Sequence, residues 1–143
     1  MKYIQLVASD IDGTLLLNGA KVLDSEIFKL IRELHKKGIL FMAASGREYT
    51  NLHNLFAPVA DDIAFLCLNG CLTFYRDKCI SKEIMNSVIA KKLIKTFQKD
   101  PDAEILVSGE KTCYITPKDD SYYEHLINVV KNHVTIVDDL LNI

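Results

Sequence analysis

Two aspartates, Asp10 and Asp12, directly follow an apolar stretch near the N-terminus. Carboxylates at this spacing can share one cleft, where one of them attacks a phosphorus atom and forms an aspartyl-phosphate. The other can protonate the leaving group and then take a proton from water, if its surroundings raise its pKa towards the working pH. Such oxygens also suit Mg²⁺, which keeps several waters and uses only one or two carboxylates. The pair therefore predicts metal-assisted phosphoryl transfer.

The same Asp-Ile-Asp-Gly run could instead be a simple turn, because Asp and Gly are common turn residues. A two-acid motif also occurs as a metal-binding pair in nucleotide-sugar transferases. The apolar run in front of Asp10 and the Thr14-Leu15-Leu16 run behind it favour catalysis. Gly13 permits a sharp change of direction, and Thr14 can hold the loop through a local hydrogen bond.

Three apolar runs in the first half of the chain each end in polar residues. The expected order is strand, helix, strand, helix, strand, at residues 3–9, 24–37, 39–44, 48–56 and 63–68. This order predicts an α/β fold with a doubly wound parallel sheet and right-handed crossovers. Working residues of such sheets sit at the carboxyl ends of the strands. The ends here are Ser9-Asp10, Ser45-Gly46-Arg47 and Asn69-Gly70.

Short sequence motifs predict individual turns, helix caps and strands within this order. Asn18-Gly19 lies between apolar residues, which predicts a hairpin turn within residues 15–23. Apolar residues at helical spacing, with Asp24 or Ser25 as N-cap and Gly38 after the last turn, predict the first helix. The all-apolar run at residues 39–44 predicts a strand that is buried on both faces.

The pattern changes after residue 70. A hairpin is expected at residues 72–80, and a second α/β region follows, with elements at 86–99, 103–107, 112–116, 119–131 and 134–137. The change predicts a core domain at residues 1–82 and an α/β cap domain at residues 83–143.

Composition excludes several classes of function. The chain has 143 residues, of which 49% are apolar, and a net charge of −2. This balance predicts a packed globular protein without the basic field that nucleic-acid binding requires. We see neither a secretory signal nor an apolar run long enough to span a bilayer, so we expect no membrane partner and a cytoplasmic location. The four cysteines lack metal-ligand spacing and are expected to be reduced thiols.

The motifs resemble those of a known family. Asp-Ile-Asp-Gly-Thr-Leu-Leu from Asp10 resembles the first signature of the haloacid dehalogenase superfamily, and Ser45-Gly46-Arg47 resembles the second. Asn69-Gly70, followed by a hairpin and an α/β insertion, is similar to the Cof-type branch with a class IIB cap. The resemblance covers essentially the whole chain and is most specific through residue 75. It implies a Mg²⁺-dependent phosphatase that acts on a small phosphorylated metabolite, such as a sugar phosphate, through an aspartyl-phosphate.

The resemblance also implies roles for individual residues. Asp10 would be the nucleophile and a Mg²⁺ ligand, and Asp12 the general acid/base that binds the metal through its backbone carbonyl. Ser45, with its neighbour Gly46, would bind the transferring phosphoryl group. Arg47 could make a bidentate phosphate contact or be a solvated residue of the next helix. Asn69 could touch the substrate or simply start the hairpin.

Two further signatures of the family are not found in the chain. They are a lysine that steadies the nucleophile and an acidic cluster that completes the metal site, and both follow the cap in the Cof-type order. The acids at residues 138–139 lack the glycine-led context of that cluster. We therefore expect an N-terminal portion of a longer hydrolase, whose first strand presents an unpaired apolar edge that favours self-association.

Two other interpretations compete with an active phosphatase. The first is a non-catalytic phosphate- or metal-binding remnant, or an assembly subunit that keeps half a site. The second is a response-regulator receiver, whose phospho-acceptor Asp would stand at the end of the third strand. Asn69 occupies that position here, and the large α/β insertion also argues against a receiver.

Overall fold

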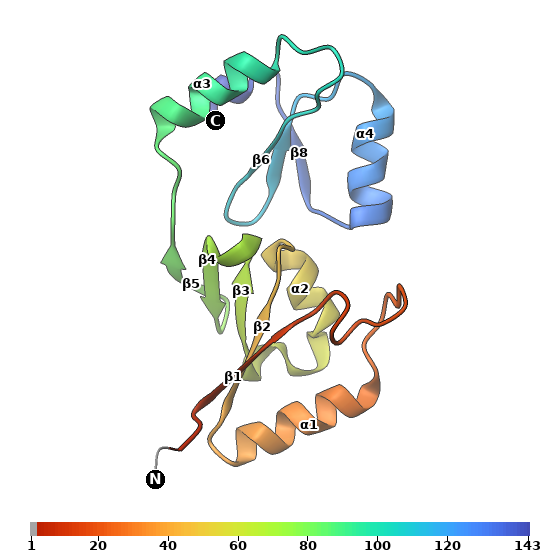
Figure 1. Cartoon of the computed structure of the whole chain (residues 1–143), viewed down its shortest axis with the longest axis vertical. Coiled ribbons are helices and arrows are strands. Elements are labelled where there is room, and N and C mark those ends of the chain that lie inside the picture. The colour runs from red at the N-terminus through yellow and green to blue at the C-terminus, as the bar shows by residue number, and fades with distance from the viewer. Residues whose placement is uncertain (1–2) are drawn as a thin grey trace. The chain divides into compact units, whose positions relative to one another are not determined.

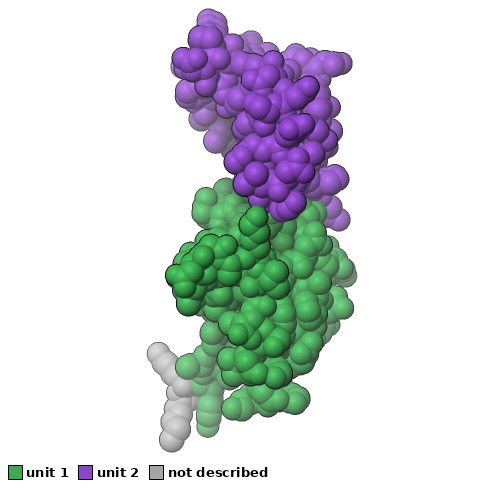
Figure 2. All heavy atoms as spheres, turned by 90° about the vertical axis from the view of Figure 1, so that its right-hand side faces the viewer, with its two compact units in different colours: residues 1–83 green, residues 84–143 purple. Residues whose placement is uncertain are grey.

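The structure is a computed structural model that describes residues 3–143. The chain divides into two compact units, Met1–Glu83 and Ile84–Ile143 (Figure 2). Within the described residues, no helix is both long enough and apolar enough to cross a membrane.

The first unit is built around a five-stranded sheet with the order β1-β2-β3-β4-β5 (Figure 1). Neighbours among β1, β2 and β3 are parallel, whereas β4 and β5 join antiparallel as a hairpin. The strands are β1 Leu6–Asp10, β2 Leu40–Ala44, β3 Ala64–Cys67, β4 Leu72–Tyr75 and β5 Lys78–Lys82. The parallel strands and the connecting helices confirm the predicted α/β fold.

Helices connect the parallel strands. They are α1 Ser25–Lys36 and α2 Tyr49–Leu55, and 3₁₀ turns follow at Ala57–Asp62 and Leu68–Gly70. The side chain of Asp24 accepts a hydrogen bond from the Glu26 amide and so caps α1. Gly38 has a φ of +71° just beyond the last turn, a conformation that glycine adopts without steric cost. The capping predictions for α1 are confirmed.

An aromatic cluster joins both helices to one face of the sheet. Phe56 is fully buried, and its ring lies 6.5 Å from Phe28 of α1, 6.1 Å from Phe41 of β2 and 6.3 Å from Phe65 of β3, centroid to centroid. Such pairs contribute beyond their buried area. The core of this unit therefore lies between the sheet and the layer of α1 and α2.

The opposite face of the parallel strands is covered less. On β2, Phe41 and Ala43 are buried, but Leu40 and Met42 are only half-buried. The predicted burial of this strand on both faces is therefore wrong. The reason is the strand order: three successive strands added in one direction with right-handed crossovers place both helices on the same face.

Strand β1 lies at the edge of this sheet and pairs with β2. Leu6 on β1 is 47% exposed. An edge strand offers unpaired backbone groups to other chains. Self-association through this edge stays a prediction.

The segment between β1 and α1 forms the predicted turn but not the predicted hairpin. Asn18 and Gly19 both have positive φ angles, and the Ala20 amide donates to the Leu17 carbonyl at 3.0 Å. No strand flanks this turn within residues 15–23. Leu16 and Leu23, on either side of the turn, are instead buried in the core.

The second unit contains a three-stranded sheet with the order β6-β7-β8, in which β6 is antiparallel and β8 parallel to β7. Its elements are α3 Ser87–Phe97, β6 Leu106–Ser108, β7 Cys113–Ile115, α4 Asp120–His125, a π-helical turn Leu126–Val130, β8 Val134–Ile136 and a 3₁₀ turn Leu140–Asn142. Asp139 caps this last turn by accepting the Leu141 amide at 2.9 Å. That acid therefore has a structural role.

A buried tyrosine ties α2 to the β4–β5 hairpin. The Tyr49 hydroxyl donates a short hydrogen bond to Asp77 in the hairpin turn, and its ring stacks on Phe74 at 3.9 Å. Burial raises the pKa of Tyr49 well above its usual range, and the Asp77 hydrogen bond and charge raise it further. The contact joins two elements that are 28 residues apart in the chain.

Replacing Tyr49 with Phe is expected to lower the free energy of unfolding by about 1 kcal/mol near neutral pH, because one hydrogen bond to a mostly exposed carboxylate is lost. The difference should shrink above about pH 10, where the unfolded tyrosine ionises and the folded one does not. Urea unfolding followed by circular dichroism at both pH values measures this. Tyr3→Phe, at an 83% exposed position, is the control and should leave the free energy of unfolding unchanged at either pH.

Candidate active site

The loop after β1 holds the two aspartates at the carboxyl end of the sheet. Ile11 between them is fully buried and anchors the loop in the core. Its carbonyl oxygen accepts the amides of Thr14, Leu15 and Leu16 at 3.2, 2.9 and 2.8 Å. These bonds close a compact turn, which Gly13 completes with a φ of +84°.

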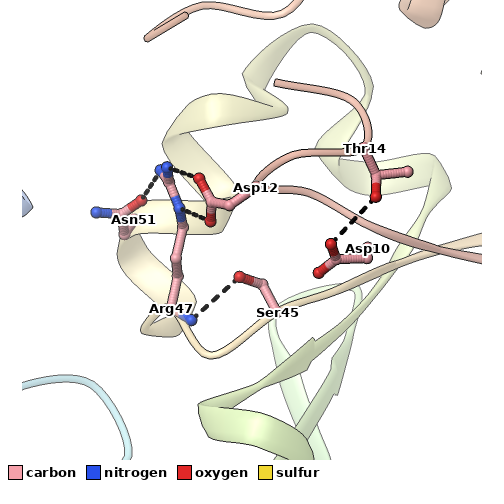
Figure 3. Close-up of polar contacts among 6 residues, drawn as sticks. All are labelled: Asp10, Asp12, Thr14, Ser45, Arg47 and Asn51. Atoms are coloured by element: carbon pink, nitrogen blue, oxygen red, sulfur yellow. Dashed lines mark hydrogen bonds and ion pairs between the residues drawn. The ribbon is translucent and has the colours of Figure 1, made fainter. Parts of the chain in front are cut away.

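Asp10 keeps an exposed carboxylate at the last position of β1. The Thr14 hydroxyl donates to its Oδ2 at 3.2 Å (Figure 3). This bond orients one carboxylate oxygen without burying the group. Asp10 is therefore both positioned and accessible, as a nucleophile must be.

Ser45 lies next to Asp10 because of the strand register. Asp10 pairs with Ala44, the last residue of β2, and Ser45 follows immediately. The serine is buried, and its amide donates to the Leu66 carbonyl at 2.9 Å. Its Oγ accepts the Arg47 amide at 3.2 Å, a bond in which the hydroxyl hydrogen takes no part. That hydrogen can be donated to a bound anion.

Asn69 lies against the loop that follows β2. Its amide donates to the Ser45 carbonyl at 3.2 Å. A Cβ atom at Gly46 would stand 3.0 Å from Asn69 Oδ1, so the Asn69 side chain lies close against the backbone of Gly46. Leu68 and Asn69 have φ angles of +50° and +56°, a left-handed conformation that is uncommon for residues other than glycine. Such local strain is frequent at functional sites.

Arg47 forms a bidentate ion pair with Asp12. Its Nη2 and Nε donate to Asp12 Oδ1 and Oδ2 at 2.6 and 2.9 Å, and its Nη1 donates to Asn51 Oδ1 at 2.9 Å (Figure 3). The hydrogen bond from Arg47 holds the pKa of Asp12 below its usual range, against a smaller opposing effect of burial. Sequence reasoning offered phosphate or solvent as the partners of Arg47 and passed over Asn51. The only signal for Asn51 is its spacing of four residues from Arg47.

The structure thus brings all the residues singled out from the sequence to the carboxyl ends of β1, β2 and β3. They are Asp10, Asp12, Ser45, Gly46, Arg47 and Asn69. Within residues 3–143, no cluster of three or more His, Cys, Asp or Glu side chains could hold a metal ion. The exposed Asp10 carboxylate is a hard oxygen donor, which fits Mg²⁺ because that ion takes few protein ligands and keeps its waters.

Comparisons with known proteins agree with this architecture. The family model for haloacid dehalogenase-like hydrolases matches residues 7–143. The chain is 28% identical to the 5-amino-6-(5-phospho-D-ribitylamino)uracil phosphatase YbjI of Escherichia coli (strain K12), over 98% of this chain and 52% of that protein. The chain therefore spans about half the length of this relative.

Solved structures share the fold. A crystal structure of a protein from Eubacterium rectale matches with a TM-score of 0.86 and 25% identity, over 98% of this chain and 53% of that one. The subclass IIB sugar phosphatase BT4131 of the same superfamily matches with a TM-score of 0.71 and 19% identity, over 93% of this chain and 52% of that one. With a family model that covers nearly all of its length, the chain belongs to the haloacid dehalogenase-like hydrolases.

Proposed function

We propose that this chain carries the nucleophile of a Mg²⁺-dependent phosphatase that acts on a small phosphorylated metabolite. The observation that supports the proposal is the register of β1 and β2, which sets the Asp10 carboxylate beside Ser45. Family membership supports the same reaction class. The domain assignment, a core at residues 1–82 and an α/β cap at residues 83–143, is part of the proposal.

Asp10 is the proposed nucleophile. Its carboxylate oxygen forms a bond to phosphorus while the bond from phosphorus to the substrate oxygen breaks, and the product is an aspartyl-phosphate. Water then attacks the phosphorus, releases orthophosphate and restores Asp10. Thr14 keeps the carboxylate oriented through both steps.

Asp12 is the proposed general acid/base. It gives a proton to the leaving oxygen and later takes one from water. The hydrogen bond from Arg47 lowers the pKa of Asp12, which leaves the carboxylate ionised and free to accept a proton but makes it a weaker base. The first role needs a higher pKa, and the negative charge of a bound phosphate group acts in that direction.

Phosphate binding is assigned to the two loops beside Asp10. The Ser45 hydroxyl and the backbone at Gly46 face the transferring group, and Asn69 adds a side-chain amide close to Gly46. Bound Mg²⁺ would be held by the Asp10 carboxylate and the Asp12 carbonyl, and it supplies positive charge against the repulsion between carboxylate and phosphate.

The substrate class rests on the relatives. One of them is named as a phosphatase of a phosphorylated ribitylaminouracil and another as a sugar phosphatase. We propose a sugar phosphate or a compound of similar size, with no nucleic-acid or membrane partner. We propose a cytoplasmic location with it, where the four cysteines would stay reduced.

The proposal predicts that the 143-residue chain releases orthophosphate from an aryl phosphate only when Mg²⁺ is present. Chelation with EDTA is expected to lower the rate by at least about 10²-fold, because the metal contributes several kcal/mol to this kind of reaction. Added Mg²⁺ should restore the rate. Turnover that survives complete chelation would contradict the metal requirement.

A binding protein without turnover is the second candidate, favoured by the Arg47 hydrogen bond, which lowers the pKa of Asp12 and so keeps it from holding the proton that a general acid must give. It predicts that the folded chain binds orthophosphate, as measured by calorimetry, without releasing phosphate from any substrate. That combination of results would replace the phosphatase proposal.

A further inference from the structure

All three nitrogen atoms of the Arg47 guanidinium donate hydrogen bonds to other side chains of the protein. Its Nε and Nη2 atoms form one planar edge, and both atoms of this edge bond to Asp12. A bidentate contact with a phosphate group uses such an edge. A phosphate in that position would have to displace the Asp12 carboxylate.

The third nitrogen of the guanidinium is also engaged. Nη1 donates to Asn51 Oδ1 at 2.9 Å, and Asn51 is buried on the first turns of α2. Arg47 and Asn51 are four residues apart, so the start of α2 places both side chains on one side. A buried amide that holds a guanidinium restricts its rotation, which makes the Asp12 contact geometrically specific.

The ion pair between Arg47 and Asp12 joins two segments that are far apart in the sequence. Asp12 belongs to the loop after β1, whereas Arg47 and Asn51 belong to the segment after β2, and the ion pair spans 35 residues of sequence. The Asp12 side chain is more than half exposed, so the hydrogen bonds from Arg47 are the contacts that hold its carboxylate in the described structure. The two hydrogen bonds from Arg47 Nε and Nη2 therefore orient the Asp12 carboxylate.

We infer that Arg47, held in place by Asn51, is a positioning residue that aims the Asp12 carboxylate rather than a group that binds the substrate phosphate. The inference rests on the proposed function for its consequence in catalysis. The contacts of Arg47 with Asp12 and Asn51 form without substrate, so the positioning role can be tested whether or not the chain turns over a substrate.

The primary test is the Arg47 Nε–H signal in the nitrogen-15 NMR spectrum of the full chain. We expect a slowly exchanging signal that broadens or disappears in Asp12→Asn and weakens in Asn51→Ala. Orthophosphate, the probe ligand, should leave the signal of the wild-type chain in place. The Nε–H signal of Arg76, in the β4–β5 turn, is the internal control and should not respond to either substitution.

The opposite pattern would overturn the inference. If the Arg47 signal is unchanged in Asp12→Asn but shifts on titration with orthophosphate, then Arg47 is a phosphate ligand. Because this comparison needs no turnover, an inactive chain counts against the proposed function and still leaves the role of Arg47 decided.

Kinetics provide a second readout where the chain turns over an aryl phosphate. Arg47→Ala is expected to lower kcat by about 10- to 100-fold with KM changed by less than about twofold, because a misplaced catalytic group costs rate more than binding. Added guanidinium ion should restore part of the loss, and Arg47→Lys should not, because an ammonium cannot form the bidentate contact. Arg76→Ala is the matched control. A raised KM with unchanged kcat would contradict a positioning role.

Discussion

Replacing Asp10 with Asn is expected to lower Mg²⁺-dependent phosphate release by at least about 10³-fold, because the amide cannot form the aspartyl-phosphate. The substitution keeps the size and shape of the side chain, and Asp10 is exposed at the end of β1, so folding should be unchanged. The measurement is the rate of orthophosphate release from an aryl phosphate by the purified chain, with circular dichroism as the check on folding.

The matched control is Asp138→Asn, which removes an exposed carboxylate from the segment after β8. It should retain the full rate. Equal activity of Asp10→Asn and the wild-type chain would remove Asp10 from the mechanism. Equal loss in both variants would point to a non-specific effect of charge.

Replacing Phe56 with Ala is expected to lower the free energy of unfolding by about 3–5 kcal/mol. The ring is fully buried and contacts three other aromatic rings, which come from α1, β2 and β3. Its removal leaves a cavity where the two helices meet the sheet. A loss of this size is a large part of the about 5–15 kcal/mol by which domains are usually stable, and urea unfolding measures it directly.

Phe97→Ala is the control for this experiment, since it makes the same substitution on α3 at a position that is 49% exposed. Its loss should be about 1 kcal/mol or less, because surface changes have small effects. A loss of only about 1 kcal/mol in Phe56→Ala as well would show that the stability of the first unit does not depend on the aromatic cluster.

The placement of the candidate site could be predicted from local signals. Runs of apolar residues marked β1, β2 and β3, and the polar residues after them fell at one edge because parallel strands end together. The caps of α1 and the turn at residues 76–77 could likewise be predicted from short stretches of sequence. These features depend on backbone preferences of neighbouring residues, so reading the sequence locally was sufficient.

The burial of β2 depended on more than its own residues. An all-apolar strand was expected to be covered on both faces, but both α1 and α2 lie on one side of the described sheet. The Asn18-Gly19 turn formed without its hairpin, and Leu16 and Leu23 on either side of it are buried in the core.

The sequence by itself determined that Asp10 and Asp12 stand at the end of the first strand and that Ser45 follows the second. Only the tertiary structure decided that Arg47 holds Asp12, that Asn69 lies against Gly46 and that Tyr49 bonds to Asp77. The physical reason is the distance along the chain between these partners. Periodicity and turn chemistry act between neighbours, whereas a side chain that links separate loops finds its partner only after the sheet has set the spacing of its strands.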